Sequence, residues 1–222
     1  MPSQLPLPLQ PRASLTRADF VAAPGNAQAL AFIDAWPDWP AAAAALHGPS
    51  GSGKTHLVEI WSAKSSAVVM TVQELIDGAY RQVPIAVEDV DGAPATAARD
   101  AALFALLENA TGDAPVLLTG REPPSSWPVS LPDLRSRFSA LLAFPLWAPD
   151  DALLARMARK LFADRQLRVP DQVVERMIQQ LERSPAAIRD FIARADAKAL
   201  AEGKAVSLSL VRALFDEEID GD

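Results

Sequence analysis

The chain has 222 residues, half of them apolar, which allows one large domain or two small ones. Its formal net charge of −7 argues against DNA as the main partner, because nucleic-acid binders usually carry a basic face, and the absence of cysteine excludes disulfides and zinc–thiolate sites. No apolar run approaches the roughly 18 residues of a membrane span, and the N-terminus lacks the basic and continuous apolar regions of a signal peptide, so we expect a cytoplasmic protein that does not contact membranes.

The first 18 residues contain four prolines and no periodicity, which predicts an extended tail over residues 1–18. This tail includes the stretch QLPLPL at positions 4–9, in which leucines alternate with prolines. Proline holds a peptide extended, so little conformational entropy is lost when the leucines enter apolar pockets of a partner. By itself the stretch is equally consistent with a proline-rich tail that binds nothing.

Between residues 19 and 120, helical and strand patterns alternate. We predict helices over 25–36, 55–64 and 98–111, and strands over 41–48, 66–72, 83–90 and 114–120. Asn26 is placed to cap the first of these helices. Strands that alternate with helices imply an α/β fold, in which a mainly parallel sheet is flanked by helices.

After Pro149 the pattern is purely helical. Four apolar stripes at helical spacing follow, and the helices start at Asp150 or Asp151, Pro170, Ser184 with Pro185, and Ser207. The stripes are most simply explained as a core. We therefore predict an α/β nucleotide-binding domain over residues 19–148 and a small helical lid domain over 149–222.

The stretch GPSGSGKT fits G-x-x-x-x-G-K-[ST] at every fixed position and stands between a predicted strand and a predicted helix. Its residues are Gly48, Pro49, Ser50, Gly51, Ser52, Gly53, Lys54 and Thr55. In such a loop, backbone N–H groups and the helix N-terminus surround phosphate oxygens. Lys54 can then reach the β- and γ-phosphates, and Thr55 can hold Mg²⁺. This context makes a chance glycine turn a poor explanation, so we predict binding of ADP or ATP with Mg²⁺.

A second stretch, PIAVEDVDG at positions 84–92, is an apolar strand that ends in acids. P-loop proteins use acids at this place to hold Mg²⁺ and to orient the attacking water. We predict these roles for Glu88 and Asp89, with Glu88 as the metal ligand, and Asp91 is a third candidate. The alternative is that the acids only end a strand at the surface.

A third stretch, LPDLRSRF at positions 131–138, places two arginines beside a phenylalanine shortly after the fourth predicted strand. Judged by residue type alone, an ordinary surface turn with salt bridges is the simpler explanation, and a functional role stays open. The order of the motifs along the chain suggests a more specific role.

In this order, the stretches resemble the DnaA-related AAA+ family, which comprises the bacterial replication initiator DnaA and its shorter Hda-type regulators. The resemblance covers roughly residues 19–218 and rests on DFVAAPGNAQAL (19–30), LHGPSGSGKTHL (46–57), LLTG (117–120) and DLRSRF (133–138). It implies an AAA+ P-loop NTPase fold with a helical lid. It also implies that Asn26 and His56 lie near the nucleotide, that Thr119 is the sensor I residue, and that Arg137 is an arginine finger.

Several residues depart from the family pattern. The Glu88-Asp89 order is altered, and positions 120–121 are Gly-Arg where the family has Ser-Asp. Ala187 stands at the place of the arginine called sensor II. Arg189 follows two residues later, about 200° round the helix, where we do not expect it to substitute. These departures predict weak intrinsic ATP hydrolysis.

The tail completes the resemblance, because QLPLPL is similar to the peptide with which Hda-type and other replication proteins bind the DNA polymerase sliding clamp, through Gln4, Leu5, Leu7 and Leu9. The resemblance thus implies a negative regulator of replication initiation, which docks on the DNA-loaded clamp and uses Arg137 to stimulate hydrolysis of ATP bound to DnaA. The sequence does not continue into the initiator's DNA-binding domain, so we expect no sequence-specific DNA binding. Self-association into homo-oligomers stays open.

Three other functions fit the motifs less well. An AAA+ ATPase that loads helicase or clamp subunits would share the fold, but the clamp peptide and the missing sensor II arginine are not expected in it. A small-molecule P-loop kinase would need an acceptor site, which the sequence does not show. The acidity of the chain disfavours a DNA-binding initiator fragment.

Overall fold

The computed structural model describes residues 15–78 and 82–219 of the chain. Five strands form one sheet in the order β2-β3-β4-β1-β5, and every neighbouring pair is parallel. The strands are β1 (Ala43–His47), β2 (Val68–Thr71), β3 (Ile85–Glu88), β4 (Val116–Gly120) and β5 (Leu142–Pro145). The predicted α/β class with a mainly parallel sheet is confirmed.

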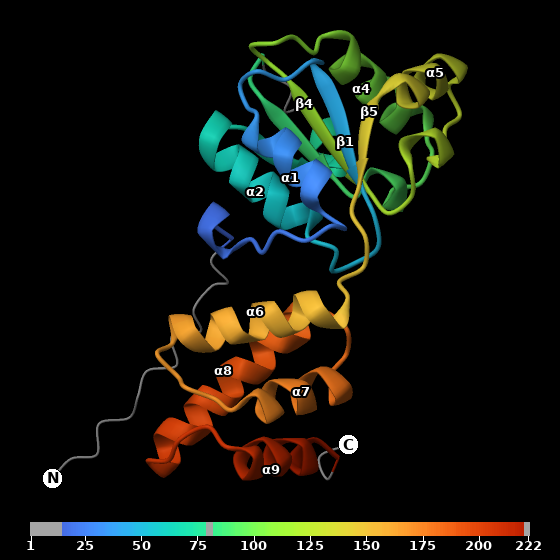
Figure 1. Cartoon of the computed structure of the whole chain (residues 1–222). Helices are drawn as coiled ribbons and strands as arrows, with labels where there is room; N and C mark the ends of the chain where they lie inside the picture. The colour runs from blue at the N-terminus through green and yellow to red at the C-terminus, as the bar shows by residue number, and fades with distance from the viewer. Residues whose placement is uncertain (1–14, 79–81, 220–222) are drawn as a thin grey trace, which may run out of the picture.

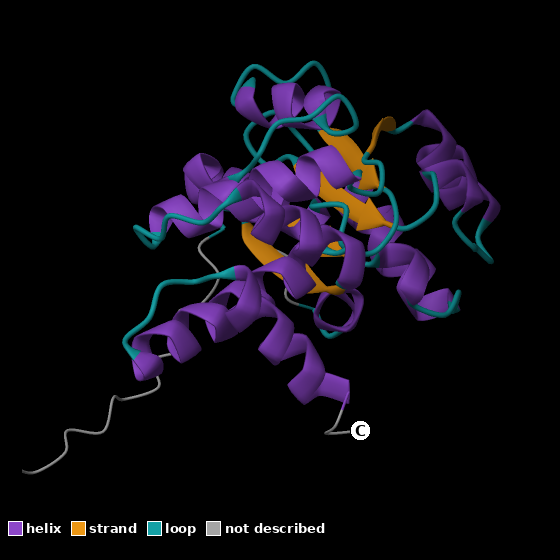
Figure 2. Cartoon of the chain, turned by 60° about the horizontal axis from the view of Figure 1, so that its bottom comes forward, coloured by secondary structure: helices purple, strands orange, loops and turns teal. Residues whose placement is uncertain are grey.

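Helices cover both faces of this sheet (Figures 1 and 2). They are α1 (Ala27–Asp34) and α2 (Lys54–Ser65) on one face, and α3 (Val72–Ile76), α4 (Ala97–Glu108) and α5 (Pro132–Ala140) on the other. Along β1, Ala44 and Leu46 pack with α1 and α2, whereas Ala45 packs with α4. This period of two is expected for a strand that is covered on both faces.

The fifth strand, β5, is not predicted by the sequence pattern. It has four residues, ends in Pro145, and pairs with β1 at the edge of the sheet. An edge strand tolerates proline, because the missing N–H is not needed by a further neighbour. Phe144 of β5 stacks on Phe32 of α1 at a centroid distance of 4.4 Å. The same aromatic cluster includes Trp36, Trp39 and Trp61.

Four helices follow the sheet and lie together below it in Figure 1. These lid helices are α6 (Asp151–Asp164), α7 (Asp171–Gln180), α8 (Pro185–Glu202) and α9 (Leu208–Ile219). The predicted caps are present, because Asp150 accepts the N–H of Leu153 at 2.7 Å and Ser184 accepts that of Ala187 at 3.1 Å. Their buried apolar side chains form one cluster, which includes Leu154, Phe162, Val173, Met177, Phe191 and Val211.

Short 3-10 helices occur at η1 (Arg17–Asp19), η2 (Val90–Gly92) and η3 (Pro124–Ser126). The first of them lies within and just after the predicted tail, and Arg17 forms a salt bridge with Asp34 of α1 at 2.9 Å. Among the described residues, no helix combines the length and the apolar character that a membrane crossing requires.

The last residue of β4, Gly120, lies against the indole ring of Trp127. A Cβ atom at position 120 would lie 2.7 Å from that ring, which is buried and donates its Nε1–H to the carbonyl of Glu122 at 2.7 Å. Gly120→Ala should therefore lower the free energy of unfolding by about 1–3 kcal/mol, as overpacking of a core does. Thermal unfolding measures this change, since each kcal/mol shifts the Tm of a chain of this size by roughly 2–4 °C.

Gly112→Ala is the matched control, because a Cβ atom at position 112 meets nothing within 4 Å. Its Tm should stay close to that of the wild type. Equal Tm values for the two variants would contradict the packing described for Gly120.

Candidate nucleotide-binding site

A cavity of about 480 Å³ lies where the carboxyl ends of the strands meet the lid helices. Parallel α/β sheets bind ligands at this edge. The phosphate loop (residues 48–55) contributes one wall and the acids after β3 contribute another. The remaining lining comes from residues 15–26, from α2, from the end of β4, from α6 with the segment before it, and from the start of α8: Leu15, Asp19, Phe20, Val21, Asn26, His56, Thr119, Arg121, Pro149, Leu153, Met157, Pro185, Ala186 and Arg189.

The phosphate loop has a backbone that requires glycine at its first position. Gly48 has a φ of 151°, and a Cβ atom there would lie 2.0 Å from the carbonyl oxygen of Leu146. Its N–H donates to the carbonyl of Gly120 at 3.2 Å, which ties the loop to β4. Gly51 and Gly53 also have positive φ values, of 75° and 103°. These conformations are open to glycine and costly for other residues, so the motif has the geometry that its sequence predicts.

The loop also contains polar groups that a phosphate would satisfy. The hydroxyl of Ser52 is buried and has no hydrogen-bond partner among the described residues. Lys54 donates to the carbonyls of Gly48 at 2.6 Å and Pro49 at 2.9 Å. Burial lowers the pKa of Lys54, and the neighbouring carboxylates of Asp89, Asp91 and Glu88 offset part of this shift. Anionic ligand oxygens would stabilise the charged ammonium, so the donor set fits a nucleotide phosphate.

Two predicted Mg²⁺ ligands are in direct contact. The hydroxyl of Thr55 donates to the carboxylate of Glu88 at 2.7 Å. Oxygen donors of this kind suit Mg²⁺, which usually takes one or two protein ligands and completes its shell with phosphates and water. The pair Thr55–Glu88 therefore fits the ion.

The other acids after β3 differ in their surroundings. Asp89 lines the cavity, and its N–H donates to the hydroxyl of Thr119 at 3.0 Å. Thr119, the predicted sensor I residue, is buried and also lines the cavity. The carboxylate of Asp91 instead accepts the N–H groups of Arg121 and Glu122, each at 2.8 Å. Asp91 thus holds the segment after β4 and is a weaker candidate for the metal than Glu88 and Asp89.

Asn26 occupies the N-cap position of α1, as predicted, but its side chain makes no capping hydrogen bond to the helix. Its side-chain oxygen accepts the N–H of Ala23 at 2.8 Å, and its amide donates to the carbonyl of Val21 at 3.1 Å. These bonds fold the loop before α1 and leave Phe20 and Val21 against the cavity. Asn26 therefore shapes the site through its neighbours as well as lining it.

His56 follows the phosphate loop on α2 and fixes the segment in front of it. Its Nε2 lies 2.9 Å from the carbonyl of Thr16, and its ring meets that of Phe20 edge to face at 5.1 Å. Burial lowers the pKa of His56, and the charge of Arg189 acts in the same direction. The ring thus connects the start of η1 to α2 at one side of the cavity.

The lid helices contribute a positively charged side chain, Arg189, whose position at the cavity does not follow from its place on the helical wheel. Arg189 of α8 lines the cavity, whereas Ala187 does not and uses its N–H to bond the cap residue Ser184. Arg189 thus lies at the cavity although it is about 200° round the helix from Ala187, and the expectation that it does not replace the sensor II arginine stays a prediction. The first residues of α8 pack beside the phosphate loop, with Pro185 near Gly51.

Arg121 is another cavity residue that the motif pattern does not single out. Its guanidinium lies 3.9 Å from the carboxylate of Asp89, and its side chain is exposed. In the sequence, Arg121 could have been found from the departure from the family pattern at positions 120–121. Arg121 supplies a positive charge opposite the acids.

Arg137 does not line this cavity. It lies on α5, about half exposed, where it forms a salt bridge with Glu108 and places its guanidinium 5.7 Å from the ring centre of Phe104. The predicted clamp-binding residues Gln4, Leu5, Leu7 and Leu9 lie outside the described residues.

Comparison with known proteins defines the class of the fold. No protein-family model and no curated protein matches the sequence. Domain III of the replication initiation protein DnaA from Thermotoga maritima matches the structure with a TM-score of 0.73 at 18% identity, over 93% of this chain and 97% of that one. AMPPCP-bound DnaA from Aquifex aeolicus matches with a TM-score of 0.77 at 13% identity, over 94% of this chain and 71% of that one.

The RuvB Holliday junction branch migration motor from Thermotoga maritima is also similar, with a TM-score of 0.64 at 16% identity, over 85% of this chain and 66% of that one. Together with the strand order 2-3-4-1-5 and the C-terminal helices, these likenesses show that the chain has the AAA+ fold. The resemblance to DnaA that the motifs indicate is thus confirmed at the level of the fold.

The geometry of the phosphate loop predicts the effect of losing its lysine. Among the described residues that line the cavity, Lys54 carries the only ammonium group, and Lys54→Ala removes it. Affinity for ADP, measured by calorimetry, should fall at least tenfold, which corresponds to about 1.4 kcal/mol or more.

Lys64→Ala is the matched control, because Lys64 lies at the other end of α2 and pairs with Asp34. Its affinity for ADP should be unchanged. A folded Lys54→Ala variant that binds ADP as tightly as the control would overturn the assignment of the cavity.

Proposed function

We propose that the chain binds ADP or ATP with Mg²⁺ in the cavity described above. The observation that carries this proposal is the complete phosphate loop, whose glycine conformations, buried Ser52 hydroxyl and Lys54 ammonium all suit phosphate oxygens. The AMPPCP-bound structure of Aquifex aeolicus DnaA, which shares the fold, supports it. When bound, Mg²⁺ would neutralise phosphate charge beside Thr55 and Glu88.

Each side chain at the site then has a distinct task. Lys54 and the loop N–H groups bind the phosphates, and Glu88 with Thr55 orients the metal. Asp89, held by Thr119, is placed to orient water. Phe20 and Val21 would cover the base, and Arg189 would approach the phosphates from the lid helices. The altered acid order supports slow intrinsic hydrolysis.

We further propose that the protein is a negative regulator of replication initiation of the Hda type. It would dock on the DNA-loaded sliding clamp through its tail and stimulate hydrolysis of ATP bound to DnaA. The likeness to DnaA over nearly the whole of domain III supports an interface between similar AAA+ domains. Arg137 lies on the surface outside this chain's own cavity, which suits a finger that enters a partner's site.

A second candidate is an AAA+ ATPase that loads helicase or clamp subunits. The likeness to RuvB, a branch migration motor, supports this second candidate, because RuvB is a motor protein with the same fold. A loader would hydrolyse ATP by itself, whereas a regulator would act mainly on the ATP of its partner. A pull-down with the sliding clamp and a turnover assay of the isolated protein separate the two.

Clamp binding should depend on the tail. Deletion of residues 1–10 removes Gln4 and the three alternating leucines, which are the groups that can enter a groove. The deletion variant should lose clamp binding in the pull-down and keep its Tm, because a proline-rich tail adds little to a core. A deletion variant that binds the clamp as well as the full chain would show that the docking site lies elsewhere.

Arg137 should act on the chemistry of the partner. Its guanidinium would neutralise charge that develops on the γ-phosphoryl group across the interface. Arg137→Ala should lower stimulated hydrolysis of DnaA-bound ATP by an order of magnitude or more. Clamp binding and affinity for ADP should remain close to wild type.

Arg135→Ala is the control, because Arg135 lies two residues away on α5 and is also exposed. Arg135 does not line the cavity, and its guanidinium donates a weak hydrogen bond to the carbonyl of Val129 at 3.5 Å. A rate that falls in Arg135→Ala and not in Arg137→Ala would identify Arg135 as the finger. A rate unchanged in both would exclude a finger mechanism.

A further inference from the structure

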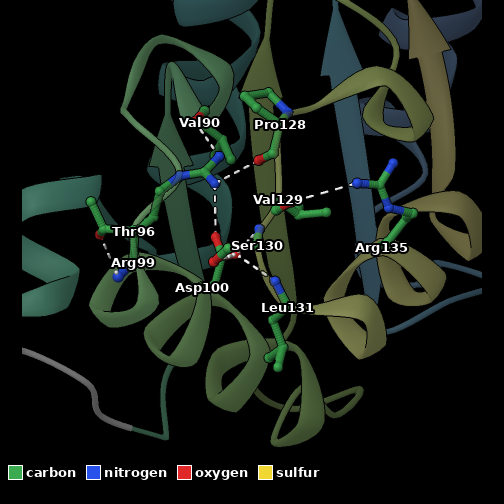
Figure 3. Close-up of polar contacts among 9 residues, drawn as sticks. All are labelled: Val90, Thr96, Arg99, Asp100, Pro128, Val129, Ser130, Leu131 and Arg135. Atoms are coloured by element: carbon green, nitrogen blue, oxygen red, sulfur yellow. Dashed lines mark hydrogen bonds and ion pairs between the residues drawn. The ribbon is translucent and has the colours of Figure 1, made fainter.

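Arg99 and Asp100 form a buried ion pair at the start of α4 (Figure 3), and neither residue lines the cavity. Both side chains are 1% exposed, and their N···O distance is 2.9 Å. Neighbouring residues of opposite charge are rarely buried together in a helix, because removing two charges from water is costly. A well-packed apolar pair would often give equal or greater stability. We therefore looked for a role of the pair other than stabilising the fold.

The guanidinium of Arg99 joins two segments that are distant in the sequence. One amino group donates to the carbonyl of Val90 at 2.8 Å. The other donates to the carbonyl of Pro128 at 2.8 Å and to Asp100 at 2.9 Å. Val90 directly follows Asp89, so Arg99 holds the turn at residues 88–91, called the acidic turn, whose first two residues line the cavity.

Asp100 fixes the other side of the same connection. One of its carboxylate oxygens accepts three hydrogen bonds, from the N–H of Ser130 at 2.6 Å, the hydroxyl of Ser130 at 2.8 Å and the N–H of Leu131 at 3.0 Å. Residues 128–131, called the α5 anchor, lead directly into the helix that carries Arg137. The helix has no side-chain cap of its own, and a carboxylate near its N-terminus complements the helix dipole. The pair thus bonds to the acidic turn on one side and to the α5 anchor on the other, as Figure 3 shows.

A second contact joins the same regions. Asp91 of the acidic turn accepts the N–H groups of Arg121 and Glu122, and the carbonyl of Glu122 accepts the indole N–H of Trp127, immediately before the α5 anchor. The acidic turn and the α5 anchor are therefore connected through a ring of hydrogen bonds. Arg99 closes this ring, because its planar fork can hold two carbonyls in fixed directions, which an ammonium cannot do.

We propose that Arg99 and Asp100 are positioning residues, which couple the acidic turn of the nucleotide site to the orientation of α5 and its Arg137. The functional part of this inference rests on the proposed role of Arg137, whereas the coupling itself does not. The ion pair sets the position of Arg137 relative to this chain's own site, so that the finger is presented correctly to a partner.

The coupling is tested on the full chain by amide hydrogen exchange. Arg99→Lys keeps the charge and loses the fork. Exchange should become at least tenfold faster both in the acidic turn with Arg121 and Glu122, and in the α5 anchor, while the phosphate loop and the lid helices keep their protection. Arg159→Lys, which alters a surface pair with Asp171 on the lid helices, is the matched control and should change neither segment.

Faster exchange in one of the two segments alone would overturn the coupling, and so would a uniform increase across the sheet, which a merely structural role predicts. If Arg99→Lys does not fold, the double variant Arg99→Met/Asp100→Leu replaces the pair by apolar side chains of similar size. The same paired increase supports the inference in that variant, and protection at the wild-type level in both segments overturns it.

The functional part is tested by stimulated hydrolysis of DnaA-bound ATP. Arg99→Lys should lower the rate at least threefold, and should cause no further fall when it is combined with Arg137→Ala, because both changes affect the same group. Normal stimulation by Arg99→Lys, together with a loss in Arg137→Ala, overturns the positioning role. If the wild-type protein itself does not stimulate hydrolysis, the proposed function fails, and the exchange measurement still decides the coupling.

Discussion

The contact between Gly48 and the carbonyl of Leu146 is the constraint on which the site depends. No side chain fits between these two backbones, and the φ of Gly48 excludes most other residues. The contact places the start of the phosphate loop against the end of β5, and the chain then passes to the lid helices. The loop, the strand ends and the lid helices all contribute residues to the lining of the cavity.

Much of this arrangement follows from short-range patterns in the sequence. The phosphate loop follows β1, and the acids and Thr119 lie at the ends of β3 and β4, where parallel strands bring their carboxyl ends to one edge. The structure places Lys54, Thr55, Glu88, Asp89 and Thr119 around the cavity accordingly. Three features could not be read this way. The strand β5 is short and ends in proline, the bonds of Asn26 depend on the path of its loop, and the place of Arg189 at the cavity depends on how the start of α8 packs beside the phosphate loop.

Polar groups at the site divide between binding and positioning. The phosphate loop contains donors that are free to bind a ligand, such as the hydroxyl of Ser52, which has no hydrogen-bond partner among the described residues. Around it, hydrogen-bonded side chains hold the backbone, as Asp91 holds the segment after β4 and Arg99 holds the acidic turn. Arg137 belongs to neither set, since its contacts are a partly exposed salt bridge and an aromatic ring. A side chain that is held so lightly can change partners at little cost.

The central claim is that this chain activates ATP hydrolysis by a DnaA-type initiator on the DNA-loaded clamp. The most direct measurement follows conversion of radiolabelled ATP to ADP on the initiator while the chain, the clamp and DNA are added one after another. We predict that conversion rises at least tenfold once all three are present and stays near its basal rate when the chain or the clamp is left out. Conversion that stays basal with all three present, or that rises equally without the chain, would contradict the claim.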